Sequence, residues 1–158
     1  MTNCEFNIVL VHPEIPQNTG GIGRLCVSNN CRLHLIEPLG FSLEDKYVKR
    51  AGMDYWEHVD CTVHKSWEAF LEAEKPETLH FFSTKGGTLY TDAVYPRSSY
   101  LVFGSEGAGL PREFYEKYSS SLVIIPMLGE FHRSLNVANA AAIGLYEAIR
   151  QQKYQQEK

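Results

Sequence analysis

The stretch that decides the fold runs from residue 6 to residue 29 and reads FNIVLVHPEIPQNTGGIGRLCVSN. Its first six residues form a near-continuous apolar run, which is typical of a strand buried on both faces of a sheet. Residues 19–29 predict a helix, because Ile22 and Cys26 recur on one face at helical spacing, and Asn18 is the expected N-cap. A buried strand joined to a helix through a glycine-rich loop is typical of α/β proteins.

The same alternation of apolar runs and helical patterns continues along the chain. Strands are expected at residues 32–36, 59–63, 78–83, 100–103 and 122–125, and helices at 42–51, 66–74, just after Pro111, and from 137 onward. Because the strands are apolar along their length, we expect a mostly parallel sheet with helices on both faces. The length of 158 residues predicts one α/β domain spanning residues 1–158.

The helix expected from residue 137 onward carries two stripes of side chains. One stripe follows the i, i+3, i+4, i+7 pattern of a core-facing side and consists of Val137, Ala140, Ala141, Gly144, Leu145, Ala148 and Ile149. The other stripe consists of Asn136, Asn139, Ile143, Tyr146 and Arg150. Small residues beside it would let another surface approach closely, so this side is a second-subunit interface, part of a site, or an ordinary polar face.

Bulk composition excludes several classes of protein. The chain is 44% hydrophobic and 22% charged, which excludes disorder and fibrous repeats. No apolar run approaches the roughly 18 residues of a transmembrane helix, and the first residues do not resemble a signal peptide, so a cytoplasmic protein without a membrane partner is expected. The four cysteines lack C-x-x-C spacing and the six histidines are scattered, so we expect reduced thiols and no metal site.

Three loops that follow predicted strands carry residues suited to ligand binding, and open α/β sheets place their ligands at such strand ends. The loops span residues 13–24, 103–111 and 125–136. The first two are rich in glycine, which lets backbone N–H groups approach a phosphate or a planar ligand closely. The sequence shows no Ser-His-Asp set, P-loop or metal-binding motif, so these loops favour a nucleoside-like cofactor.

A nicotinamide dinucleotide site is an alternative that the first loop raises. Gly21-x-Gly23 begins the dinucleotide-binding pattern, but Cys26 occupies the place of the third glycine. Glu37 also comes too early to be the acidic residue expected about 20 positions further on. A nicotinamide-dependent oxidoreductase is therefore disfavoured.

Four short motifs occur in a fixed order along the chain: Pro16-x-Asn18-Thr19-Gly20-x-Ile22-x-Arg24, Phe103-Gly104-x-Glu106-x-x-Gly109-Leu110-Pro111, Ile125-Pro126-Met127 and Arg133-Ser134-Leu135-Asn136. Together they resemble the SPOUT class of RNA methyltransferases, and most closely its small tRNA 2′-O-methyltransferases that act on the wobble nucleotide. The likeness extends from Phe6 to Tyr154. It departs from the family pattern at Ala108, where arginine is common, and at Val137 and Ala138, where Leu-Ser is common.

The resemblance implies a deep trefoil knot over about residues 100–150 that holds S-adenosylmethionine, and a homodimer with its site at the subunit interface. The implied reaction is methylation of the ribose 2′-hydroxyl of nucleotide 34, a cytidine or modified uridine, in the anticodon loop of tRNA. S-adenosylhomocysteine would be the other product. Methylation of another tRNA or rRNA nucleotide, and a non-catalytic RNA-binding protein of the same class, are the alternatives.

The resemblance also assigns residues to the site. Arg24 and Tyr146 are the implied catalytic residues, and because a guanidinium resists deprotonation, we expect Arg24 to orient the ribose and stabilise the developing alkoxide. The implied cofactor pocket consists of Phe82, Gly104, Glu106, Ile125, Met127, Ser134 and Asn136. The expected RNA-binding residues are Asn18, Arg24, Lys49, Arg50 and Arg133. Ser134 or Asn136 is in addition a candidate cap for the last helix.

The formal net charge of −4 limits how RNA can bind. Residues 54–77 carry a net charge of −5, whereas residues 15–50 carry +2. We therefore expect RNA to avoid the acidic segment around Ser66 to Glu77. Few phosphate contacts should form, which predicts a shallow dependence of RNA affinity on salt.

Overall fold

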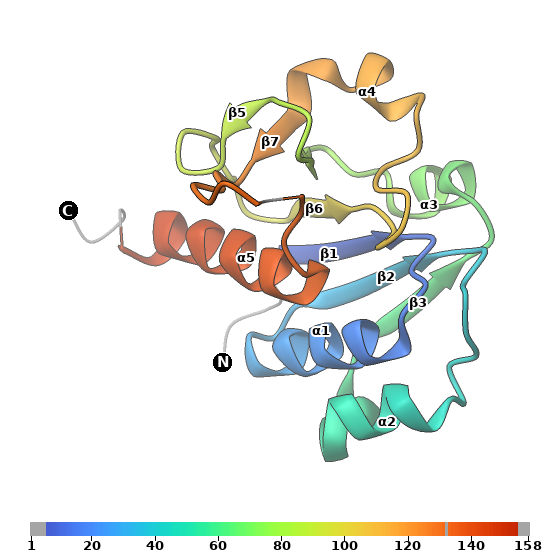
Figure 1. The fold of residues 1–158 in the computed structure, drawn as a ribbon. Coiled ribbons are helices and arrows are strands. Elements are labelled where there is room, and N and C mark those ends of the chain that lie inside the picture. Colours follow the sequence, from blue (N-terminus) through green and yellow to red (C-terminus); the bar gives the residue numbers. More distant parts are fainter. Residues whose placement is uncertain (1–5, 132, 155–158) are drawn as a thin grey trace.

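The computed structural model describes residues 6–131 and 133–154, which form one parallel sheet with flanking helices (Figure 1). The strands are β1 (Phe6–Val11), β2 (Arg32–Ile36), β3 (Cys61–His64), β4 (Leu79–Phe82), β5 (Thr88–Leu89), β6 (Ser99–Phe103) and β7 (Leu122–Ile124). They lie in the order β3-β2-β1-β6-β4-β7-β5, and each neighbouring pair is parallel. The expected parallel sheet is confirmed, and β1, which lies between β2 and β6, is buried along its whole length.

Helices cover both faces of this sheet, as the sequence predicted (Figure 1). They are α1 (Pro16–Ser28), α2 (Lys46–Gly52), α3 (Trp67–Glu74), α4 (Phe114–Lys117) and α5 (Val137–Tyr154), with the 3₁₀ turns η1 (Met53–His58) and η2 (Ser119–Ser121). Side chains of a strand alternate between its two faces. On one face Ile8 belongs to a core cluster with Ile22 of α1 and Leu145 of α5. On the other face Val9 belongs to a second cluster with Phe70 of α3.

The two stripes predicted for the last helix are found on α5. Ala141, Leu145 and Ala148 are fully buried against the sheet and α1. Ile143 and Tyr146, from the second stripe, are exposed. The use of that second stripe as a subunit interface stays a prediction.

The start of α1 differs from the sequence prediction. The helix begins at Pro16, whose fixed φ suits a first helical position, and Ile15 occupies the N-cap position without a side-chain cap. The expectation that Asn18 caps this helix is therefore wrong. Asn18 is the third residue of the helix, within its first turn, and its side chain makes contacts across the site. The short strand β5 and the turn η1 were not predicted, because β5 has only two exposed residues and η1 lacks a clear period.

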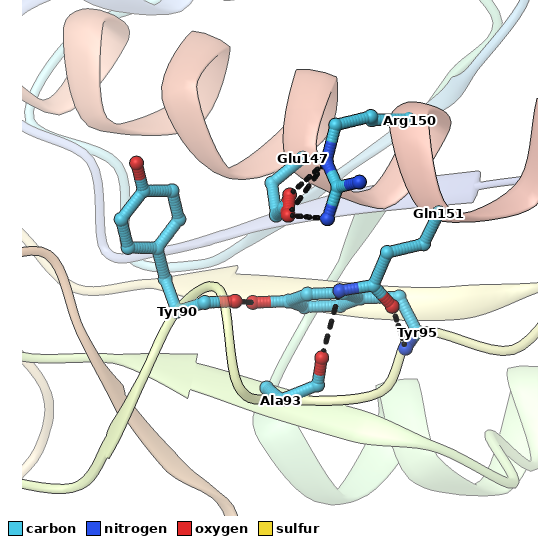
Figure 2. A network of polar contacts seen from close by, with 6 residues as sticks. All are labelled: Tyr90, Ala93, Tyr95, Glu147, Arg150 and Gln151. Atoms are coloured by element: carbon cyan, nitrogen blue, oxygen red, sulfur yellow. Dashed lines mark hydrogen bonds and ion pairs between the residues drawn. The ribbon is translucent and has the colours of Figure 1, made fainter. Parts of the chain in front are cut away.

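The C-terminal half of α5 holds the segment that leads from β5 into β6 (Figure 2). Gln151 accepts a hydrogen bond from the Tyr95 N–H at 3.1 Å and donates one to the Ala93 carbonyl at 2.8 Å. The buried Tyr95 hydroxyl donates to the Tyr90 carbonyl at 2.7 Å. These bonds fix residues 90–95 against the last helix. Within the described ranges, no helix is long and apolar enough to cross a membrane.

Candidate functional site

A cavity of about 550 Å³ lies at the carboxyl edge of the sheet, where β4, β6 and β7 end. This volume lies within the range typical of small-molecule and cofactor sites. Its lining includes all seven residues predicted for the cofactor pocket: Phe82, Gly104, Glu106, Ile125, Met127, Ser134 and Asn136. Asn18, predicted to bind RNA, lines it as well. The structure therefore brings the three loops selected from the sequence into one site.

The loop after β6 folds back on itself, and two glycines permit this. Ser105 and Gly109 exchange both backbone hydrogen bonds, at 3.0 and 2.9 Å. A Cβ atom on Gly104 would lie 2.1 Å from the carbonyl carbon of Gly109, so no side chain fits there. Gly109 has a φ of 74°, in the left-handed region that glycine adopts without steric cost. The backbone of this loop consequently forms one wall of the cavity.

Glu106 joins this loop to the N-terminus of α1. Its carboxylate accepts hydrogen bonds from the backbone N–H groups of Glu14 and Ile15, at 3.0 and 2.8 Å, and from the Asn18 amide at 3.2 Å. The Glu14 carboxylate in turn accepts a bond from the Gly107 N–H at 3.1 Å. Because α1 has no acidic residue in its first turn, Glu106 supplies the negative charge that the helix dipole favours at this end.

Asn136 extends the same network to the third loop. Its amide donates a hydrogen bond to Oδ1 of Asn18 at 3.0 Å. Its own Oδ1 accepts bonds from the N–H groups of Ala138 and Asn139 at 2.8 and 3.1 Å, so Asn136 caps α5. A continuous chain of hydrogen bonds therefore runs from the loop after β6, through α1, to the start of α5.

Apolar side chains form another wall of the cavity. Phe82 stacks on Phe103 with ring centroids 4.7 Å apart, and Ile125 and Met127 lie on the lining beside them. Gly144 of α5 allows this packing, because a Cβ atom there would approach the Phe82 ring to 2.7 Å. The cavity thus combines an apolar wall with backbone polar groups, a lining that suits a nucleoside.

Six further lining residues were not selected from the sequence as part of the site: Ser83, Thr84, Lys85, Tyr115, Val137 and Ala140. The first three follow β4 directly, so the rule that placed ligands at strand ends would also have selected this fourth loop. Tyr115 comes from α4 and carries no sequence signal of its own. Its ring centroid lies 4.9 Å from the Lys85 amino group, so the two residues form a cation–π pair at the cavity.

The two predicted catalytic residues lie outside the cavity lining of their own chain. Arg24 is exposed on α1, and its guanidinium carbon lies 5.4 Å from the ring centroid of Tyr55. Tyr146 is 53% exposed on α5, and its hydroxyl accepts a hydrogen bond from the Asn29 amide at 3.2 Å. The structure therefore does not bring Arg24 or Tyr146 together with the predicted cofactor residues.

The remaining predicted RNA-binding residues are on the surface. Lys49 and Arg50 lie on α2, and Arg133 lies in the third loop; all three are exposed. Lys49 forms an ion pair with Glu44 at 3.3 Å, and both side chains are largely solvated. An exposed ion pair of this kind contributes little to stability, so it leaves Lys49 available for a phosphate.

A cluster of titratable groups is buried beneath α3, away from the cavity. His34 lies 3.1 Å from both His64 and the Asn7 side-chain oxygen. Because a carbonyl oxygen only accepts hydrogen bonds, His34 donates one from Nε2 to Asn7. Its Nδ1 then accepts a hydrogen bond from Nε2 of His64, so both imidazole rings can be neutral. Burial lowers the pKa of His34 to about 4 and also lowers the pKa of His64.

This buried cluster also has the separations of a metal-ligand set, formed by His34, His64 and Glu74. The imidazoles, however, are hydrogen-bonded to each other, and the Glu74 carboxylate is paired with Arg32 at 3.0 Å. We therefore interpret the cluster as a structural network.

The fold and the cavity define an α/β protein with a parallel sheet and a strand-end site suited to a nucleoside cofactor. The sequence model of the SpoU rRNA Methylase family matches residues 5–146 of this chain. The chain belongs to this family and is a methyltransferase.

Two curated relatives carry the name tRNA (cytidine(34)-2′-O)-methyltransferase. One, from Saccharophagus degradans, is 50% identical over 147 residues, which cover 92% of this chain and 95% of the relative. Another, from Escherichia coli strain K12, is 46% identical over 150 residues, which cover 94% of this chain and 95% of the relative. These relatives confirm the resemblance drawn from the four sequence motifs.

Solved structures share the fold. One, described as giving structural insights into the 2-OH methylation of C/U34 on tRNA, has a TM-score of 0.88 at 43% identity and covers 93% of this chain and 95% of that chain. The SpoU methyltransferase AviRb from Streptomyces viridochromogenes, in complex with the cofactor AdoMet, has a TM-score of 0.82 at 24% identity. It covers 96% of this chain and 59% of that chain, and it shows the shared fold.

Proposed function

We propose that this protein transfers a methyl group from S-adenosylmethionine to the ribose 2′-hydroxyl of nucleotide 34 of tRNA, a cytidine or a modified uridine. One observation carries the proposal. A chain that is 50% identical to a relative named for this reaction folds its matching motifs around one nucleoside-sized cavity. The target in the anticodon loop is accessible to a compact protein, because unpaired bases can be splayed out of the loop.

The residues around the cavity fit S-adenosylmethionine in size and chemistry. When bound, this cofactor supplies an electrophilic methyl group on a positively charged sulfonium. The apolar part of the lining, which includes Phe82, Phe103, Ile125 and Met127, suits an adenine ring, and the backbone of residues 104–109 offers polar groups for a ribose and an amino acid. The apolar wall also excludes water, which favours a reaction that disperses charge.

The site is completed by a second copy of the chain in a homodimer. Arg24 and Tyr146 are exposed and lie outside their own cavity lining, so a partner copy is the natural source of both groups at the reacting ribose. On α5 Ile143 is exposed, and the small residues Ala138 and Ala142, which are one turn apart, permit close packing of another helix. A guanidinium stays protonated, so Arg24 binds the ribose or its phosphate and stabilises the oxygen as its proton leaves.

RNA contacts are assigned to Lys49, Arg50 and Arg133, which are exposed cations. Asn18 is assigned to RNA binding and also to holding the loop after β6 and the start of α5 in place, because its amide nitrogen donates to Glu106 and its amide oxygen accepts from Asn136.

Residues 1–158 act as one cytoplasmic domain whose C-terminal part, about residues 100–150, forms a deep trefoil knot. Two features support the knot. β7 lies between β4 and β5 although both precede it in the chain. After β7 the chain continues into α5, which hydrogen-bonds back to the segment at residues 93–95.

Mapping of 2′-O-methyl groups in tRNA from cells that lack this protein tests the proposal. We expect loss of methylation at nucleotide 34 of a few tRNAs, restored by the wild-type chain but not by Arg24→Lys, which keeps the charge and loses the planar fork. Loss confined to ribosomal RNA would assign a different substrate. Unchanged methylation together with RNA binding would identify a non-catalytic binder. Sedimentation of the purified protein checks the homodimer.

A further inference from the structure

The helix α2 forms a basic surface, and one exposed aromatic ring lies on it and a second on the neighbouring turn η1. The sequence of α2, KYVKRAG, supplies three cations and no acid. Tyr47 is 39% exposed and Tyr55 is 40% exposed, and they are two of the three exposed tyrosines in the part of the chain that the structure describes. Tyrosine combines a large apolar ring with a polar hydroxyl, which suits it to interfaces that are partly wet.

Each of these rings has a cation over one face. The Lys46 amino group lies 5.1 Å from the ring centroid of Tyr47. The Arg24 guanidinium carbon lies 5.4 Å from the ring centroid of Tyr55. Such pairs are weak in solvent, but they restrict how each ring is oriented. Each ring therefore has a cation over one face, while 39–40% of the tyrosine surface stays accessible to solvent.

The backbone under the two rings is anchored. α2 packs against α1 and η1, and Val48, the residue after Tyr47, is fully buried. Trp56, the residue after Tyr55, packs closely on α1, since a Cβ atom at Gly23 would lie 2.6 Å from its ring. Two exposed tyrosines next to buried anchors make a fixed surface rather than a pair of loose side chains.

We propose that Tyr47 and Tyr55 form a stacking platform for unpaired RNA bases, flanked by Lys46, Arg50 and Arg24 for the phosphates. The inference rests on the proposed function for the identity of the RNA, an anticodon loop. Aromatic rings that stack on bases and cations that follow the backbone are the two elements by which proteins hold single-stranded RNA. Arg24 lies over one face of the Tyr55 ring. An RNA base stacked on Tyr55 would therefore bring the ribose of the adjacent nucleotide close to Arg24, the arginine assigned to the reaction.

The charges on this surface favour RNA as the occupant over another protein. Glu44 and Asp45 are the acidic residues directly before α2, and Asp54 and Glu57 are the acidic residues of η1, whereas α2 itself carries three cations and no acid. Glu44 pairs with Lys49, and the Asp45 carboxylate accepts a hydrogen bond from the Tyr47 N–H at 2.8 Å. Exposed aliphatic side chains, which an apolar protein interface would use, are absent from residues 46–51. The surface thus presents rings and cations, which match the flat bases and the phosphates of RNA.

The test is fluorescence-anisotropy binding of three RNA probes to the full chain: an anticodon stem-loop, an unstructured single strand and a fully paired duplex. The variant Tyr47→Leu/Tyr55→Leu keeps apolar side chains but removes the rings, and Tyr47→Phe/Tyr55→Phe keeps the rings. We expect the leucine variant to bind the stem-loop and the single strand more weakly, by between about 5-fold and 100-fold for each ring lost. The phenylalanine variant should bind as the wild type does, and duplex affinity should not change.

Lysine substitutions give a matched control for the cations. Lys46 and Lys117 both lie over a neighbouring tyrosine, the latter 5.5 Å from the ring of Tyr118, but only Lys46 is on the proposed platform. Lys46→Ala should weaken binding of all three probes, and Lys117→Ala should not. Calorimetric titration with S-adenosylhomocysteine checks the cofactor site of each variant, and circular dichroism checks its fold.

The platform is overturned if the leucine variant binds the single strand as tightly as the wild type does, or loses duplex affinity to the same extent. It is also overturned if the phenylalanine variant fails like the leucine variant, or if the leucine change instead dissociates a dimer in sedimentation. The single-strand probe separates this inference from the proposed function. Ring-dependent binding of that probe without methylation of nucleotide 34 would retain the platform and refute the reaction.

Discussion

Replacement of Glu106 by glutamine tests whether its carboxylate holds the cavity together. In the folded chain this carboxylate accepts two backbone N–H bonds, from Glu14 and Ile15, and a third bond from Asn18. Glutamine retains one oxygen, so at least one N–H then faces an NH₂ group, and the negative charge at the start of α1 is lost. A hydrogen bond to a charged group contributes about 1.5–3 kcal/mol, and the charge at a helix N-terminus adds about 0.3–1 kcal/mol.

Because Glu106 is partly solvated, we expect the lower part of these ranges, which is a loss of about 2 kcal/mol in the free energy of unfolding. Urea denaturation followed by circular dichroism measures it. Ile15 and Asn18 also line the cavity, so the affinity for S-adenosylhomocysteine should fall together with stability. Glu72→Gln, on the exposed side of α3, is the control and should change stability by less than about 0.5 kcal/mol.

The reasoning on Glu106 is refuted if the Glu106→Gln chain unfolds within about 0.5 kcal/mol of the wild type while its affinity for S-adenosylhomocysteine is unchanged. If Glu106→Gln lowers the free energy of unfolding but leaves the affinity for S-adenosylhomocysteine unchanged, the carboxylate contributes to folding and not to cofactor binding.

Three further predictions follow from the glycines and the buried histidines. Gly144→Ala should destabilise by about 1–3 kcal/mol and weaken binding of S-adenosylhomocysteine, since its Cβ atom meets the Phe82 ring at 2.7 Å. By contrast, Gly21→Ala, with nothing within 4 Å, should stabilise α1 by up to about 1 kcal/mol; equal effects of the two changes would contradict the packing argument. Gly104→Ala should abolish binding of S-adenosylhomocysteine in calorimetry, because the loop after β6 cannot close, and unchanged affinity would show that the loop opens at little cost. Stability should be complete above pH 6.5 and fall by up to about 3 kcal/mol toward pH 4, because the pKa of His34 is about 4 when folded and about 6.5 when unfolded. His34→Gln should flatten this part of the pH profile of urea denaturation, and a profile as steep as that of the wild type would assign the protons to other groups.

Local sequence patterns predicted much of the fold. The run of residues 6–11 and the apolar stripe of α5 are visible from neighbouring residues alone, and both were found as expected. The predicted N-cap Asn18 was wrong for a reason that no local pattern contains. The carboxylate that serves the start of α1 belongs to Glu106, which is 91 residues from Ile15 in the sequence.

The candidate site was partly predictable. Strand-end loops were selected because parallel sheets gather ligands at one edge, and the seven predicted pocket residues do line one cavity. The loop at Ser83 to Lys85 was missed although it follows the same rule and leads directly into Gly86 and Gly87. The placement of Arg24 against Tyr55, outside the cavity, depends on how α1 and η1 pack, which sequence spacing does not encode.

The sequence by itself determined the alternation of strands and helices, the two-sided burial of the sheet and the residues that carry the family resemblance. These features depend on periodicity and composition within short stretches of chain. Only the tertiary structure decided that Asn18 links Glu106 to Asn136, and that two buried histidines satisfy each other. Such contacts join residues from distant parts of the chain, and they follow from the strand order β3-β2-β1-β6-β4-β7-β5, which the free energy of the whole fold selects.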